Sequence, residues 1–195
     1  MNGMHFILLI IFSAFTMNLT LQCALGIRGI AESRIYNGFS TMVKLGIILF
    51  SIILMWILFS KIISTFISGF FIYALLFPVS YIVYDSLEFV VFQQILKKDP
   101  KEKCFVSFPG GITAVAVFIC LNIAINFLEA ILLSFGFTAG ILIVYFIIRE
   151  IGKRAALEAV PRFLRGIPLL IIVMGLLSLI FSFASLMILR MISAG

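Results

Sequence analysis

Six long apolar runs constrain the fold of this chain more than any other feature of its sequence. Most of them reach the roughly 20 residues that a helix needs to cross the hydrocarbon of a bilayer. The chain is also 64% hydrophobic and 11% charged, whereas a soluble globular domain is roughly 45–50% apolar and 25% charged. The sequence therefore predicts an all-α integral membrane protein with six transmembrane helices, at 5–27, 39–60, 62–85, 112–133, 135–148 and 167–189.

The distribution of Lys and Arg predicts how these helices are oriented. Lys61 and Arg190 fall on one side of the membrane, and Lys44 lies inside the second run, where we expect its side chain to snorkel towards the interface. The other eleven basic residues lie in the loops on the opposite side: Arg28, Arg34, Lys97, Lys98, Lys101, Lys103, Arg149, Lys153, Arg154, Arg162 and Arg165. Because positively charged loops stay in the cytoplasm, we expect both termini to lie outside it.

The charged loop at 93–111 divides the chain into two halves of equal helix count. We interpret 1–195 as a single membrane domain with a three-helix half at 1–92, a cytoplasmic connecting loop at 93–111 and a second three-helix half at 112–195. An odd number of spans in each half makes the halves cross the membrane in opposite directions. The sequence therefore predicts two inverted three-helix repeats, an arrangement common in proteins with a site at the midplane.

Glycine and proline residues predict two local features of the second half. Pro109, Gly110 and Gly111 precede the fourth run and suit a broken or re-entrant start to that helix, although a plain loop also explains them. We allow for such a break in the first helix of each half. Gly136 and Gly140 form a GxxxG pattern, which predicts that the fifth helix packs closely on a neighbour.

Two connections on either side of the fifth run carry further expectations. The fourth and fifth runs are expected to be joined by a very short turn near Ser134. The segment 149–165 is expected to form a short interfacial helix on the cytoplasmic surface, ended by Pro161. Within it, Glu150 and Arg154 are four residues apart and predict an acid-to-base pair.

Three carboxylates near the ends of spans are candidates for an ion path. An ionisable group in lipid costs at least a few kcal/mol, so it points by default to the passage of an ion or a proton. Glu129, near the outer end of the fourth run, is the strongest candidate, and the alternative is that it only reaches the interface. Asp85 and Glu88 lie near the inner end of the third run and are expected to be interfacial.

The cysteines offer a second candidate site. Cys23 and Cys120 are each the sole cysteine in the first span of their half. Ordinary apolar packing explains such cysteines well. Thiolates also suit iron and sulfur, and a cluster held by four thiolates could take two from this chain and two from a partner.

Several function classes are excluded by what the sequence lacks. Three cysteines do not form a secreted disulfide framework, and His5 is the sole histidine, which removes most metal-hydrolase and catalytic-triad schemes. There is no flavin or nicotinamide fingerprint, so we expect no catalysis by this chain alone and assign no catalytic residue. The basic residues form short clusters rather than a continuous face, so no nucleic-acid partner is expected.

The last third of the chain carries a recognisable motif. Its residues are Arg149-Glu150, Val160-Pro161, Phe163, Arg165-Gly166, Gly175, Leu177-Ser178-Leu179 and Phe181. Earlier in the chain, Asn18, Leu21 and Leu25-Gly26 in the first span and Pro109 before the fourth agree with the same pattern. The chain resembles the Rnf/Nqr membrane subunit family, and within it the RnfA/NqrE type. The resemblance covers essentially the whole sequence.

The resemblance implies a six-span subunit of a bacterial inner (cytoplasmic) membrane, built from two inverted halves and paired with a homologous membrane subunit of opposite orientation. Such pairs belong to complexes that move electrons from ferredoxin or NADH to another acceptor and couple this flow to sodium or proton transport. The paired subunits hold a 2Fe-2S cluster between half-helices. By resemblance, Cys23 and Cys120 are the candidate cluster ligands in this chain, and Glu129 is the candidate ion-path residue.

The cysteines are displaced from the positions that the family uses. The family's first cysteine follows Leu-Gly after one intervening residue, where this chain has Arg28, whereas Cys23 lies three residues before Gly26. In the second half the family's cysteine falls near Val115, whereas this chain has Cys120. Either the helices are shifted in register and both cysteines still bind the cluster, or the chain is a divergent member without one.

Two other functions remain compatible with the sequence. A small six-helix solute carrier, or the substrate-binding membrane component of a transporter, would have similar length and hydropathy. A purely structural assembly subunit would fit the displaced cysteines.

Overall fold

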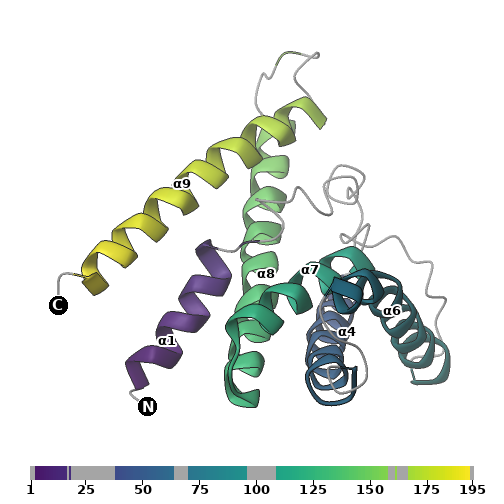
Figure 1. The fold of residues 1–195 in the computed structure, drawn as a ribbon. Helices are drawn as coiled ribbons and strands as arrows, with labels where there is room; N and C mark the ends of the chain where they lie inside the picture. Colours follow the sequence, from purple (N-terminus) through teal and green to yellow (C-terminus); the bar gives the residue numbers. More distant parts are fainter. Residues whose placement is uncertain are drawn as a thin grey trace.

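The computed structural model describes residues 3–16, 18, 38–63, 70–95, 109–157, 161 and 167–193. Every regular element within these ranges is helical (Figure 1). The first half contains α1 (Gly3–Ile11), α4 (Gly38–Ile57) and α6 (Phe70–Phe89), which continue directly into the π-helical turns η1 (Phe12–Thr16), η2 (Leu58–Ile63) and η3 (Val90–Ile95). The second half contains α7 (Pro109–Ile123), α8 (Phe127–Leu157) and α9 (Ile167–Ser193). The all-α prediction is confirmed for the described residues.

Three of these helices are long and apolar enough to cross a membrane. Their spanning stretches are Met42–Lys61, Phe71–Gln93 and Phe127–Ile151. Shorter apolar helical stretches occur at Phe6–Thr16, Gly110–Ile123 and Ile171–Met187. Helices of spanning length are therefore confirmed for the second, third and fifth positions, and the total of six spans stays a prediction.

The outward faces of α6 and α9 carry many large apolar side chains. Large side chains on α6 and α9 are exposed over much of their surface, among them Phe71, Phe77, Ile82, Leu179 and Phe183. A soluble monomer rarely exposes a continuous apolar surface of this kind, because water penalises it. The exposed aliphatic and aromatic side chains fit a chain surrounded by lipid.

The connection between α7 and α8 lies at residues 124–126, so the turn expected near Ser134 is wrong. Ser134 is buried inside α8, where its hydroxyl donates to the carbonyl of Ala130 at 2.6 Å. A serine satisfied in this way does not break a helix. The helix begins instead after Asn126, whose carbonyl accepts a hydrogen bond from the backbone N–H of Ala130 at 3.1 Å.

The fifth helix is also longer than the sequence predicts. α8 has 31 residues and ends at Leu157, so the first part of the expected interfacial helix at 149–165 is a continuation of α8. At about 1.5 Å per residue it exceeds the roughly 30 Å thickness of a bilayer core. The predicted Glu150–Arg154 pair is confirmed, with 3.4 Å between Oε1 and Nε, and both side chains are exposed.

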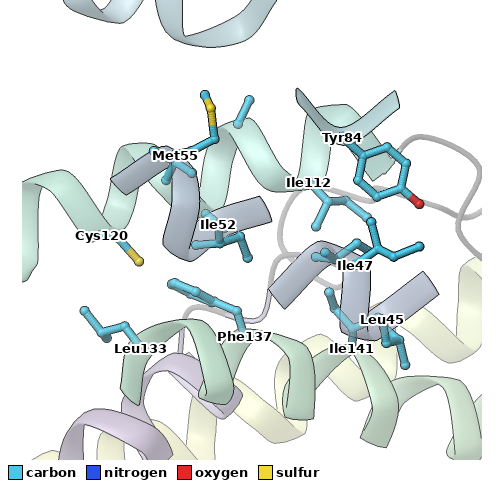
Figure 2. Close-up of a cluster of buried hydrophobic side chains, with 14 of the residues drawn as sticks. Leu45, Ile47, Ile52, Met55, Tyr84, Ile112, Cys120, Leu133, Phe137 and Ile141 are labelled. Carbon is cyan, nitrogen blue, oxygen red and sulfur yellow. The ribbon is translucent and has the colours of Figure 1, made fainter. Parts of the chain in front are cut away.

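α8 organises the described part of the fold. It contacts α1, η1, α4 and α7, while α7 also lies against α4 and α6, and α9 contacts η1. Buried apolar side chains from α4, α6, α7 and α8 meet in one cluster (Figure 2). The labelled members include Ile47, Ile52 and Met55 of α4, Tyr84 of α6, Ile112 of α7, and Leu133, Phe137 and Ile141 of α8.

The GxxxG pattern places the first helix against α8, which confirms the predicted close approach. A Cβ atom on Gly136 would meet the Ser13 side chain and lie 2.8 Å from the Ile10 carbonyl oxygen. On Gly140 it would lie 2.7 Å from the Ala14 carbonyl oxygen. Only glycine allows two helix backbones to approach this closely.

Candidate functional site

Cys120, the candidate ligand in the second half, is enclosed in the helix packing. It lies on α7 with 0% of its surface exposed. Figure 2 shows its sulfur directed towards Leu133 and Phe137 of α8, and the hydroxyl of Ser134 lies beside the thiol. A thiol in these surroundings acts as a small apolar side chain with a weak hydrogen-bond donor.

This placement does not fit a cluster shared between two subunits. Such a cluster needs thiolates at the surface where the subunits meet, because each subunit supplies part of the ligand set. The Cys120 thiol instead faces α8 of its own chain. Cys23 lies outside the described residues, as does Cys104. Within the described ranges there is no group of three or more His, Cys, Asp or Glu residues that could hold a metal ion. The cluster at Cys23 and Cys120 stays a prediction.

Glu129, the candidate ion-path residue, lies in the first turn of α8 rather than at the end of the preceding helix. Its side chain is buried, with 5% of the residue exposed, and Oε2 accepts a hydrogen bond of 2.9 Å from the backbone N–H of Ile125. A carboxylate at the third helical position that reaches back to the preceding backbone is a common helix cap, and the helix dipole also favours negative charge there. Glu129 therefore has a capping role in this geometry, and its place on an ion path stays a prediction.

Asn18 joins the first helix to the middle of α8. It is 2% exposed, and its amide nitrogen donates to the carbonyl oxygens of Ala14 at 3.0 Å and Gly140 at 3.1 Å. The second bond connects residues 122 positions apart. A buried amide that bonds two backbone carbonyls fixes the position of the chain just after η1 relative to the second half.

The sequence analysis did not predict the ion pair between Lys44 and Glu88. Lys44 Nζ on α4 lies 2.9 Å from Glu88 Oε1 on α6, and the two side chains are only 8% and 15% exposed. The ammonium also lies 5.4 Å from the ring centroid of Phe92 in η3. Both charged residues fall within stretches long and apolar enough to span a membrane. Lys44 is therefore buried beside a partner of opposite charge, and its expected snorkelling towards the interface stays a prediction.

The acidic residues of α6 differ sharply in their surroundings. Asp85 is exposed, whereas Glu88, three residues further along, turns inward to the ammonium. The sequence does contain a signal for this pair, because a charge inside an apolar run needs a partner of opposite sign. Lys44 lies near the start of one run and Glu88 near the end of the next, so antiparallel helices bring them to the same level.

Comparisons with known proteins do not identify a relative. No protein-family model matches the sequence, and no curated protein matches it closely enough to be counted as related. Any family membership and activity are therefore proposals.

Proposed function

We propose that this chain is a membrane subunit of an ion-translocating electron-transport complex of the Rnf/Nqr type, in which electron transfer from ferredoxin or NADH is coupled to transport of Na⁺ or H⁺. The chain is non-catalytic alone and pairs with a homologous membrane subunit of opposite orientation. The sequence resemblance in the first span, before α7 and in the last third of the chain supports this assignment.

The observation that carries the proposal is the pattern of helix contacts. Two inverted halves would be related by exchange of α1 with α7, α4 with α8 and α6 with α9. This exchange would turn the contact of α1 with α8 into that of α7 with α4, and the contact of α6 with α7 into that of α9 with η1, while the contact of α4 with α8 would map onto itself. The contacts of α4 with α6 and of α7 with α8 lack counterparts of similar extent among the described helices, so the pattern agrees in part with the inverted three-helix repeats of many ion-coupled membrane proteins.

The placement of the helix ends supports the proposed topology. In Figure 1 the beginning of α1 and the end of α9 lie towards the same end of the molecule as the beginning of α8, while the end of α8 and the beginning of α9 lie at the opposite end. This arrangement suits termini that share one side of the membrane, outside the cytoplasm of a bacterial cell. The exposed basic residues Arg149 and Arg154 near the end of α8 suit the cytoplasmic face.

The burial of Cys120 supports one of the two alternatives for the cluster. A thiol held between α7 and α8 next to Ser134 favours a divergent member in which this chain acts as scaffold and Cys120 packs the core. We therefore derive no electron-transfer step through this residue. The proposed contribution of the chain is to hold its partner subunit and to form part of the membrane path near Glu129.

The test is purification from native membranes in mild detergent, followed by identification of partners and measurement of iron and acid-labile sulfide. Co-purification with a homologous six-helix subunit and a flavoprotein is the expected result. A chain that purifies alone, colourless and with a bound small solute would refute the proposal and support the solute carrier instead.

Two matched cysteine variants then test the cluster in the purified complex. Cys120→Ser should leave its iron content and visible absorbance unchanged, because the native thiol faces α8. The same measurement on Cys23→Ser tests the ligand in the first half. Loss of iron in Cys120→Ser alone would show that the buried thiol becomes a ligand when the partner is present.

A further inference from the structure

The strongest unassigned feature of the described chain is the charged pair between α4 and α6. We propose that Lys44 is a tethered counter-ion: its ammonium occupies the place beside Glu88 that a mobile cation would otherwise take, and so keeps mobile cations away from this carboxylate. The inference goes beyond the proposed function and does not depend on it.

The geometry gives the ammonium the position of a bound cation. Nζ lies 2.9 Å from Glu88 Oε1, which is contact distance for a charge-assisted hydrogen bond. The ring of Phe92 also lies close to the ammonium, 5.4 Å from Nζ to the centroid. An aromatic face attracts a cation through its quadrupole. A carboxylate and an aromatic ring therefore both lie within interaction distance of the charge.

The position of Glu88 in its helix brings its carboxylate and the Phe92 ring to the same ammonium. Glu88 lies in the last turn of α6, which continues without a break into the π-helical turn η3 at Val90. Phe92 of η3 lies about one turn further along, so one continuous helix supplies both groups that contact Lys44.

Burial separates this pair from an ordinary surface ion pair. The exposed Glu150–Arg154 pair is 71% exposed at Arg154 and 57% at Glu150, whereas the values for Lys44 and Glu88 are 8% and 15%. A charge held in apolar packing cannot be left alone without a large cost, so removing the ammonium should make Glu88 take up another cation or a proton. The experiment measures whether Glu88 binds Na⁺ once the Lys44 ammonium has been removed.

The experiment follows thermal unfolding of the detergent-solubilised full chain through the fluorescence of Trp56. This is the sole tryptophan, and it is buried on the same helix as Lys44. The probe is Na⁺, with choline chloride at equal ionic strength as the reference. The variant is Lys44→Gln, which removes the charge but keeps a hydrogen-bond donor, and the matched control is Lys61→Gln on the extension of α4.

The unfolding temperature of the wild type should be the same in Na⁺ as in choline. The unfolding temperature of Lys61→Gln should likewise not differ between the two salts. Lys44→Gln should unfold at a lower temperature in choline and recover in Na⁺. Above the dissociation constant, its unfolding equilibrium constant should fall about tenfold for each tenfold rise in Na⁺. The double variant Lys44→Gln/Glu88→Gln should lose this response, because no carboxylate is left to bind the ion.

Three results would overturn the proposal. The first is a Lys44→Gln variant that unfolds identically in both salts. The second is a wild type that is itself stabilised by Na⁺ relative to choline. The third is a Lys44→Gln variant that folds in neither salt while Lys44→Arg folds normally, since a mobile cation would then be unable to replace the tethered one.

Discussion

Gly140→Ala tests the closest helix contact in the described fold. The new Cβ atom would lie 2.7 Å from the Ala14 carbonyl oxygen and 3.2 Å from the Ala14 Cα. Both are backbone atoms and cannot rotate away, so the helices have to separate. The same movement lengthens the bond from Asn18 Nδ2 to the Gly140 carbonyl, which is 3.1 Å in the native chain.

The expected magnitude follows from three opposing terms. Overpacking a well-packed contact costs about 1–3 kcal/mol, and weakening the Asn18 hydrogen bond costs up to about 1 kcal/mol more. Replacing glycine by alanine inside a helix returns about 1 kcal/mol through helix propensity. Gly140→Ala should therefore lower the free energy of unfolding by up to about 3 kcal/mol, with a value of about 1.5 kcal/mol from the middle of each range.

Gly46→Ala on α4 and Gly175→Ala on α9 are matched controls. A Cβ atom at either position would meet no other atom within 4 Å. These variants should gain up to about 1 kcal/mol. Unfolding in mixed micelles of increasing denaturing-detergent content, followed by Trp56 fluorescence, gives all three values. The reasoning fails if Gly140→Ala is as stable as Gly46→Ala, because the close approach of the two backbones would then be incorrect.

Four smaller predictions follow from the same geometry. Asn18→Ala should cost about 1–2 kcal/mol, since it removes the hydrogen bonds from a buried amide to the Ala14 and Gly140 carbonyls; an unchanged unfolding midpoint would contradict this. Glu129→Ala should cost about 1 kcal/mol through loss of the helix cap, and Glu129→Gln, which keeps an acceptor for the Ile125 N–H, should cost less; equal losses would argue against the cap. Maleimide should label Cys120 in the unfolded chain but not in the folded one, in a background with the other cysteines replaced by serine; rapid labelling of the folded chain would show that the thiol is accessible. Arg154→Ala should change stability by less than about 0.5 kcal/mol, as is usual for an exposed ion pair, and a larger loss would show that the end of α8 is packed against another element.

Local patterns in the sequence were sufficient for much of the fold. The apolar runs predict helices, and the GxxxG spacing of Gly136 and Gly140 predicts that α8 packs closely on a neighbour, which the structure identifies as α1. The Glu150–Arg154 spacing likewise predicts the ion pair. The ion pair and the GxxxG surface each depend on residues four apart on one helix, so the helical repeat places the two residues of each pair on one face.

The boundary between α7 and α8 shows why hydropathy alone misplaces a turn. Ser134 is a polar residue between apolar stretches, but its hydroxyl bonds to the carbonyl of its own helix and needs no turn. The true start of α8 carries a stronger signal, because Asn126 is followed three residues later by Glu129. This spacing is typical of a capping box. Side-chain capping chemistry was therefore a better guide to this boundary than the average hydropathy.

The Lys44–Glu88 pair required tertiary information. Each residue lies near the end of an apolar run, where a long charged side chain ordinarily reaches water. Only the packing of α4 against α6 turns both side chains inward and brings them to 2.9 Å. The exposed Asp85 lies on the same helix and has the same charge. The sequence did not distinguish it from Glu88.

Under the proposed function, the different surroundings of Glu88 and Glu129 predict different roles for the two carboxylates in ion transport. The Lys44 ammonium is paired with Glu88, so a cation moved by the proposed complex would meet a carboxylate that already has a counter-ion. Within the described part of the chain Glu129 is in no ion pair, and its Oε2 accepts one bond from Ile125. An ionised carboxylate has about four acceptor positions, so the cap leaves room for a cation or a proton donor. In the reconstituted complex, Glu129→Gln should therefore reduce ion transport while leaving the fold intact, whereas Glu88→Gln should act mainly on stability. Normal transport in Glu129→Gln together with lost transport in a folded Glu88→Gln variant would contradict this assignment. It would show that Glu88, and not Glu129, takes part in transport.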